Sequence, residues 1–131
     1  MISAYIKKIE GAISSASFII SSDLQKYYSS TSSAAYIRGR VVFSDMSFLE
    51  FSEFLLHKTN KVIVDKYRYQ YMDSSKRFVF RYDNAPHHKE IPTFPSHKHA
   101  GDVVIESKTP IFVDVLAEIA SSIVTSSTKN R

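Results

Sequence analysis

Hydrophobic and polar positions alternate along the chain in patterns that predict two helices at its ends. Isoleucines recur at helical spacing in residues 2–14, and this spacing predicts an N-terminal helix. Residues 17–28 have the pattern of a strand, and the polar segment 29–34 predicts a loop. Residues 110–124 predict a second helix, with Pro110 suited to its first turn. Its apolar stripe consists of Ile111, Val115, Leu116, Ile119 and Ile123.

Two hairpins are predicted between these helices, the first in residues 35–56. Two apolar runs flank residues 44–47, a polar segment that contains the turn-forming Asp45. A four-residue turn at this point sets Phe43 opposite Phe48 and Arg38 opposite Glu53. We therefore expect Arg38 and Glu53 to form a weak ion pair at the surface.

The second predicted hairpin covers residues 61–83 and turns at residues 73–76. Pairing across this turn sets Met72 opposite Arg77 and gathers aromatic residues on one face. These aromatics are Tyr67, Tyr69, Tyr71, Phe78, Phe80 and Tyr82. The other face then carries Arg68 opposite Arg81 and Lys66 opposite Asp83, where it is open to solvent or to a ligand.

The order of elements predicts one α+β domain over residues 1–131. It consists of an N-terminal helix, a five-stranded antiparallel meander, a long His/Pro-rich loop and a C-terminal helix. The loop between Asp83 and Pro110 contains four of the five histidines and most of the four prolines. Prolines stiffen a loop, and a loop of this length in a compact domain is usually functional or disordered.

Composition narrows the function only slightly. The net charge of +4 is compatible with a nucleic acid or an acidic partner, and it also fits an ordinary solvated surface. The absence of cysteine excludes disulfides, thiolate metal sites and cysteine nucleophiles. No segment is apolar enough to predict a membrane span, so we expect a cytoplasmic protein.

The segment "RFVFRYDNAPHH", followed by "IPTFPSHKHAGD", resembles the signature of the TumE family, small prokaryotic toxins of toxin–antitoxin pairs. The matching residues are Arg81 to His88, Pro92 to Pro95 and His97 to His99, and the hairpin "RVVFSDMSFLEFSEF" also fits. The resemblance covers the chain from about residue 34 onward, with Met46 where the family often has glycine. It implies a toxin with an antitoxin protein as its partner, but it implies no particular chemistry.

The residues of the loop themselves fit metal-free cleavage of RNA. This reaction needs a base, an acid and cations that bind the phosphate. Candidate catalytic residues are His87, His88, His97, His99 and Asp83, and candidate phosphate-binding residues are Arg81, Lys98 and Arg68. We expect seven of these side chains to converge in one pocket, because Arg81 and Asp83 project from the same face of a strand. The seven are Arg81, Asp83, His87, His88, His97, Lys98 and His99.

Two alternatives remain open. His87 or His88, with His97, His99 and Asp83, has the ligand types of a zinc or manganese site, although no cofactor is required by the first hypothesis. The loop can also be purely structural, or part of a binding module that acts without catalysis. RNA and the antitoxin are the candidate partners, and an exposed aromatic sheet edge would favour a homodimer.

Overall fold

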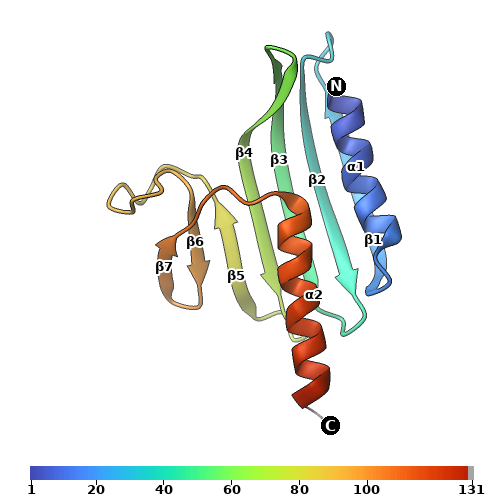
Figure 1. Ribbon diagram of the computed structural model, residues 1–131, viewed down its shortest axis with the longest axis vertical. Coiled ribbons are helices and arrows are strands. Elements are labelled where there is room, and N and C mark those ends of the chain that lie inside the picture. Colours follow the sequence, from blue (N-terminus) through green and yellow to red (C-terminus); the bar gives the residue numbers. More distant parts are fainter. Residues whose placement is uncertain (130–131) are drawn as a thin grey trace.

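The computed structural model describes residues 1–129, with side chains up to residue 124. Within this part the chain forms two helices and seven strands, and the strands make one antiparallel sheet in sequence order. The elements are α1 (Ile2–Ser15), β1 (Ile19–Tyr28), β2 (Ala34–Phe43), β3 (Phe48–Lys58), β4 (Lys61–Met72), β5 (Phe78–Asp83), β6 (His97–Ala100), β7 (Val103–Glu106) and α2 (Phe112–Lys129). Both helices lie on the same side of the sheet (Figure 1).

The prediction of a five-stranded meander was wrong, because the segment expected to be a long loop contains β6 and β7. These strands pair Ala100 with Val103 across a two-residue turn, Gly101 and Asp102. Gly101 has φ +59°, a left-handed conformation that glycine adopts without a steric penalty. The connection after β5 is therefore limited to residues 84–96, and β6 extends the sheet by pairing with β5.

One face of the sheet packs against the helices and forms the core. The isoleucine stripe of α1 is buried as predicted, at Ile2, Ile6, Ile9 and Ile13. The stripe of α2 was predicted with one error. Ile111 precedes the helix and is 55% exposed, and Phe112 takes its place in the core, where its ring packs on that of Phe51.

Neither described helix has the length and apolar character needed to span a membrane.

The predicted register of the first hairpin was wrong by one residue. Met46 has φ 70°, and Phe43 bonds with Ser47 across a turn that has one residue fewer than we predicted. Arg38 therefore lies opposite Ser52. Because a slip of one residue reverses the face, Glu53 points into the core, and the expected pair with Arg38 does not form.

The register of the second hairpin was wrong by two residues, which preserved the faces. The turn again has one residue fewer than predicted, since Lys76 has φ 64°, and a bulge beside Met72 adds a second shift. Tyr67, Tyr69, Tyr71 and Phe80 are buried on the core face, whereas Phe78 is 38% exposed. Arg68 lies opposite Asp83 and not opposite Arg81, and Lys66 lies opposite Phe54 of β3.

Candidate functional site

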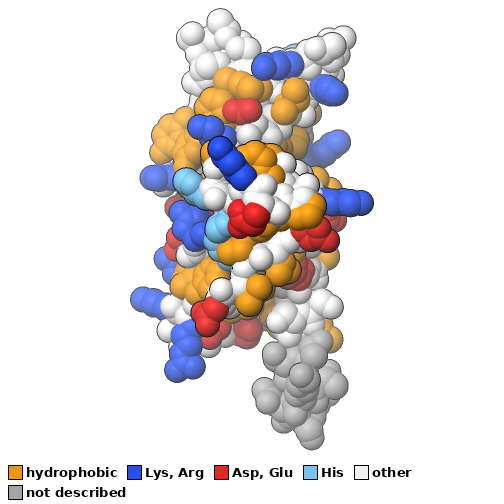
Figure 2. Space-filling model, turned by 90° about the vertical axis from the view of Figure 1, so that its left-hand side faces the viewer, with side chains coloured by type: hydrophobic (Ala, Val, Ile, Leu, Met, Phe, Trp, Pro, Cys, Tyr) orange, Lys and Arg blue, Asp and Glu red, His pale blue; other side chains and the backbone are white. Residues whose placement is uncertain are grey.

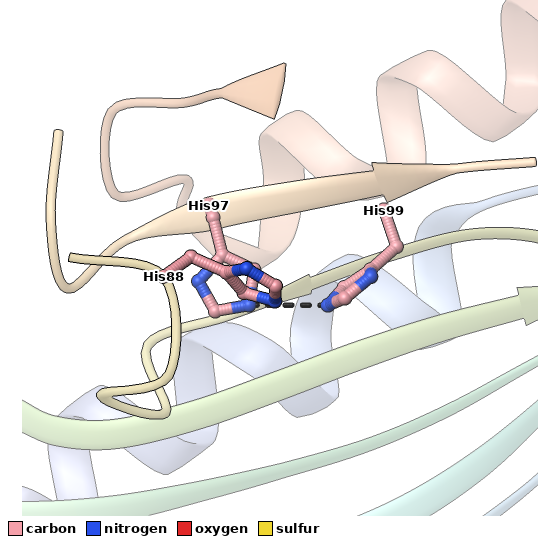
Figure 3. Close-up of side chains that lie close together, drawn as sticks. All are labelled: His88, His97 and His99. Carbon is pink, nitrogen blue, oxygen red and sulfur yellow. Dashed lines mark hydrogen bonds between the residues drawn. The ribbon is translucent and has the colours of Figure 1, made fainter. Parts of the chain in front are cut away.

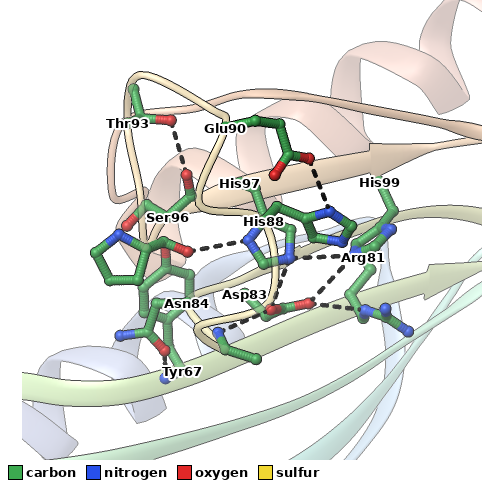
Figure 4. Close-up of polar contacts among 12 residues, drawn as sticks. Tyr67, Arg81, Asp83, Asn84, His88, Glu90, Thr93, Ser96, His97 and His99 are labelled. Atoms are coloured by element: carbon green, nitrogen blue, oxygen red, sulfur yellow. Dashed lines mark hydrogen bonds and ion pairs between the residues drawn. The ribbon is translucent and has the colours of Figure 1, made fainter.

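Asp83, at the end of β5, is the central residue of a polar cluster on the face of the sheet away from the helices. Its side chain is almost completely buried. Oδ1 accepts a hydrogen bond from the backbone N–H of Ala85 at 3.0 Å and lies 3.0 Å from Nε2 of His97. Oδ2 accepts a hydrogen bond from Nε of Arg81 at 2.9 Å and lies 3.7 Å from Nε2 of His99 (Figure 4). One carboxylate therefore orients a guanidinium group and two imidazole rings.

His97 is held on both of its ring nitrogens. Nδ1 lies 2.9 Å from the carbonyl oxygen of Pro95, and the ring is only 2% exposed. A carbonyl oxygen only accepts, so Nδ1 carries a proton. Nε2 then faces Asp83, and it also lies 3.1 Å from Nε2 of His99. These contacts on both nitrogens make His97 a buried positioning group for the more accessible His99.

His99 and Arg81 lie opposite each other on β6 and β5. Burial and the Arg81 guanidinium lower the pKa of His99 below its ordinary value, so this imidazole is neutral at neutral pH. Arg81 uses Nε to bind Asp83. Within the described residues, no hydrogen bond engages its two terminal amino groups, and these groups are the ones that clamp a phosphate.

His88 reaches the cluster from the loop that precedes β6. Its ring lies 5.6 Å from that of His99 and 4.9 Å from that of His97 (Figure 3). Nδ1 lies 3.3 Å from a carboxylate oxygen of Glu90, a contact that orients the ring. Its side chain is 29% exposed and that of His99 is 20% exposed, so a ligand can reach both rings.

These side chains line a hollow of about 540 Å³, which we call the histidine pocket. This volume lies within the usual range of roughly 300–1,000 Å³ for ligand sites. Its lining residues are Lys66, Tyr67, Arg68, Arg81, Asp83, Asn84, Ala85, Pro86, His87, His88, His97 and His99. Of the candidate site residues, all but Lys98 lie here, and the exposed His87 makes no side-chain hydrogen bond within the described residues.

Lys98 lies on the opposite face of β6. It donates a hydrogen bond of 2.8 Å to Glu118 of α2 and lies over the ring of Tyr82. Burial alone would lower the pKa of Lys98, but the bonds to Glu118 and Tyr82 raise it above its ordinary value. Alternation along a strand accounts for this separation, because neighbouring residues project to opposite faces. Lys98 therefore ties the sheet to α2 and is not available to a phosphate in the pocket.

Short polar bonds hold the loop of residues 84–96 in place. The side-chain amide of Asn84 accepts a bond from the backbone N–H of Tyr67 and donates one to the carbonyl oxygen of Asp65, so it extends the pairing of β4. Thr93 accepts a bond from the backbone N–H of Ser107, and Ser96 bonds Thr109. The loop is thereby fixed to β4 and to the segment that follows β7, which suits a preorganised site.

The sequence analysis missed one buried group on the other face. Glu53 is fully buried, and both of its carboxylate oxygens accept hydrogen bonds, one from the hydroxyl of Tyr5 and one from that of Tyr69. Burial raises the pKa of Glu53 above its ordinary value. The available signal was a charged residue in the middle of an alternating apolar strand. The incorrect hairpin register placed Glu53 opposite Arg38 and therefore on the surface.

The histidine pocket also has the elements of a metal site. One ring nitrogen each of His88, His97 and His99 can lie within 4.8 Å of the others, so the three side chains could hold one divalent ion. His88, and not His87, completes this set. The carbonyl bond of His97 is the outer contact that commonly orients a metal-binding imidazole. The cations Lys66 and Arg81 in the pocket lining oppose a second positive charge.

The fold and the pocket together define a class: a small α+β protein whose helix-covered sheet carries a polar site on its open face. The family model described as "Toxin TumE" matches residues 9–123 of the chain, and the chain therefore belongs to this toxin family. The match begins well before residue 34, where the sequence resemblance was first specific. No curated protein matches the chain significantly, and no solved structure does either.

Met46 stands where the resemblance led us to expect glycine, and the structure shows why either residue can occupy the turn. This residue has φ 70° in the turn between β2 and β3, a conformation that glycine adopts freely and other residues rarely do. The glycine that the resemblance led us to expect here would fit the same turn. The substitution affects the hairpin and lies outside the pocket lining.

Proposed function

We propose that the toxin cleaves RNA in the histidine pocket by metal-free acid–base chemistry. The observation that carries this proposal is a pair of accessible imidazoles, His88 and His99, whose ring centroids lie 5.6 Å apart beside a phosphate-clamping Arg81. Two imidazoles within reach of one phosphate, one to accept a proton and one to donate it, are the arrangement that an acid–base mechanism needs. Membership of a toxin family supports an antitoxin protein as the natural partner.

The proposed steps conserve every atom of the RNA. Neutral His99 removes the proton of a ribose 2′-hydroxyl, and the 2′-oxygen forms a bond to the adjacent phosphorus. The bond from phosphorus to the 5′-oxygen of the next nucleotide breaks, and protonated His88 donates a proton to that oxygen. The products are a 2′,3′-cyclic phosphate and a 5′-hydroxyl end. Arg81 stabilises the negative charge that develops on the phosphate, and Asp83 and His97 position Arg81 and His99.

The charge of the pocket favours a phosphate over a metal ion as its ligand. Lys66, Arg68 and Arg81 line it, and Asp83 is the carboxylate among the lining residues. A positive pocket attracts a polyanion and raises the cost of binding a divalent cation. A metal mechanism remains the second candidate because of the three clustered histidines, and chelation separates the two.

Purified protein and a labelled single-stranded RNA test the proposal. We expect the wild type to cleave the RNA equally well with and without EDTA. His99→Ala and His88→Ala should each slow cleavage by about 10²–10⁴-fold, the usual contribution of a proton-transfer group. His57→Ala is the matched control, because this histidine lies on β3 outside the pocket lining.

Two results would reject the acid–base mechanism. Loss of cleavage in EDTA, with recovery on adding zinc or manganese, would replace it by the metal mechanism. Equal RNA cleavage by His99→Ala and the wild type would show that the histidine pocket is not the site of the reaction. RNA without the 2′-hydroxyl next to the cut must resist cleavage, since the 2′-oxygen is the proposed nucleophile.

A further inference from the structure

A second hollow lies on the same face as the histidine pocket and meets it at Arg68. It has a volume of about 390 Å³ and is bordered by β1, β2, β3 and β4. Its lining residues are Asp23, Gln25, Tyr36, Arg38, Gly39, Arg40, Glu50, Phe51, Ser52, Arg68 and Gln70. Arg68 lines both hollows, so the open face is a continuous surface that leads into the pocket.

The strand register arranges this surface in rows that run across the strands. One row joins Gln25, Arg38, Ser52, Arg68, Asp83 and His97 from β1 to β6. The next row joins Asp23, Arg40, Glu50, Gln70, Arg81 and His99. Each row therefore begins at the β1 edge, crosses arginines and ends at a histidine of the pocket.

Two of these arginines have no carboxylate partner among the described side chains. Arg38 donates a bond of 2.7 Å to the neutral amide of Gln25, and Arg68 donates one of 2.7 Å to that of Gln70. Arg40, by contrast, lies 3.8 Å from the carboxylate of Glu50. Bonds to amides orient a guanidinium group and leave its charge free to attract an anion. Figure 2, which looks from the β7 side, shows Lys and Arg side chains gathered with the histidines along its left-hand margin.

Aromatic rings form a third row beside the arginines. Tyr27, Tyr36 and Phe54 are paired in sequence across β1, β2 and β3, and each is at least 36% exposed. The rings of Tyr27 and Tyr36 stack with centroids 6.2 Å apart. Exposed rings next to cations on an open sheet are the arrangement on which unpaired bases stack. A base-paired duplex hides its base faces, so this row selects a single strand.

We propose that this open face is a binding track for single-stranded RNA that leads a strand from the β1 edge into the histidine pocket. The inference deepens the proposed function and rests on it. Bases stack on Tyr27, Tyr36 and Phe54, and phosphates bind Arg38 and Arg68 before the strand reaches Arg81. Four strand spacings separate β1 from β5, which is about 19 Å. Such a track holds a few nucleotides and sets how the RNA enters the site.

The test measures binding separately from cleavage, with a fluorescent 2′-O-methyl RNA of about ten nucleotides, whose blocked 2′-oxygen cannot attack. Fluorescence anisotropy should show binding to the wild type and to His57→Ala alike, because His57 lies outside both hollows. Arg38→Ala combined with Arg68→Ala should weaken binding at least tenfold and reduce the slope of log K against log salt by about 1.4, since each lost phosphate contact removes about 0.7. Tyr36→Ala with Phe54→Ala should weaken it at least about fivefold per ring.

The matched control is Lys7→Ala combined with Lys8→Ala, which removes two positive charges from exposed positions of α1, on the other side of the sheet. This control should bind like the wild type. Equal weakening in the control, tighter binding of a duplex, or no binding of the oligomer to the wild type would overturn the track. A wild type that cleaves a dinucleotide but fails to bind the oligomer refutes the track and leaves the proposed function intact. If purified antitoxin binds through the arginine and aromatic rows while RNA does not, the face is a protein interface and the track is also overturned.

Discussion

Removal of one buried hydroxyl from Tyr69 tests how the core holds the carboxylate of Glu53. Tyr69→Phe leaves Oε2 of Glu53 without its donor, while Tyr5 still serves the other oxygen. A hydrogen bond to a charged group contributes about 1.5–3 kcal/mol, and Glu53 is too buried for water to replace it. Where Glu53 is ionised, we expect a loss of about 2 kcal/mol, which for a domain of this size lowers Tm by about 7 °C.

The cost of Tyr69→Phe should also depend on pH, which makes the prediction more specific. Because burial raises the folded-state pKa of Glu53, the folded protein keeps this proton at pH values where the unfolded chain releases it. This group therefore destabilises the fold as pH rises from about 4.3, the ordinary value for Glu, through its folded pKa. The Tyr69 hydroxyl stabilises the charged form, so the cost of Tyr69→Phe should be smallest near pH 4 and largest above the folded pKa.

Urea unfolding at several pH values measures this difference. Tyr71→Phe is a matched control on the same strand, since its buried hydroxyl binds the neutral Ser47. It should cost about 1 kcal/mol at every pH. In a Glu53→Gln background, the cost of Tyr69→Phe should no longer vary with pH, because the carboxyl group is gone. A cost of Tyr69→Phe that stays the same from pH 4 to the highest pH at which the protein is folded, or that never exceeds that of Tyr71→Phe, would refute the reasoning.

Two further predictions concern other parts of the fold. Gly39→Ala should destabilise the protein by about 1–3 kcal/mol in urea unfolding, because a Cβ there would lie 2.8 Å from the Phe51 ring and 2.9 Å from the Asp23 carbonyl oxygen. Gly11 of α1 has open space around it, so Gly11→Ala should stabilise the protein by up to about 1 kcal/mol. Equal effects at the two glycines would contradict the close packing at Gly39. Asn84→Ala should lower the free energy of unfolding by about 1–3 kcal/mol and slow RNA cleavage, because the Asn84 amide fixes the loop to β4. Full activity with normal stability would show that these bonds do not position the pocket.

The helices and the faces of the sheet were predictable from the sequence because periodicity determines them. The isoleucines of α1 and the alternating tyrosines of β4 point where their spacing predicts. The strands β6 and β7 were missed because each has four residues and is too short to show alternation. The Gly101–Asp102 turn between them directly follows a His-rich segment that we interpreted as a loop. A glycine followed by aspartate between Ala100 and Val103 was the available hairpin signal.

The candidate residues of the site could be named from the sequence, but their roles could not. The segment from Arg81 to His99 contains the residues that meet around Asp83, and alternation along β6 separates Lys98 from His97 and His99. Which histidine is buried depends on contacts between segments distant in sequence, such as the Asp83 carboxylate facing His97. Hairpin register was the other weak point, since a left-handed residue such as Met46 changes the turn and shifts every pair after it.

The measurement that tests the central claim most directly is the chemical identity of the RNA ends after cleavage. Purified wild-type protein, in EDTA, is incubated with a defined single-stranded RNA, and the fragments are weighed by mass spectrometry beside those from His99→Ala. Acid–base cleavage in the histidine pocket predicts fragments with a 2′,3′-cyclic phosphate and a 5′-hydroxyl, and at least about 100-fold less of them from His99→Ala. Fragments that carry a 5′-phosphate, or intact RNA after incubation with active toxin, would contradict the account.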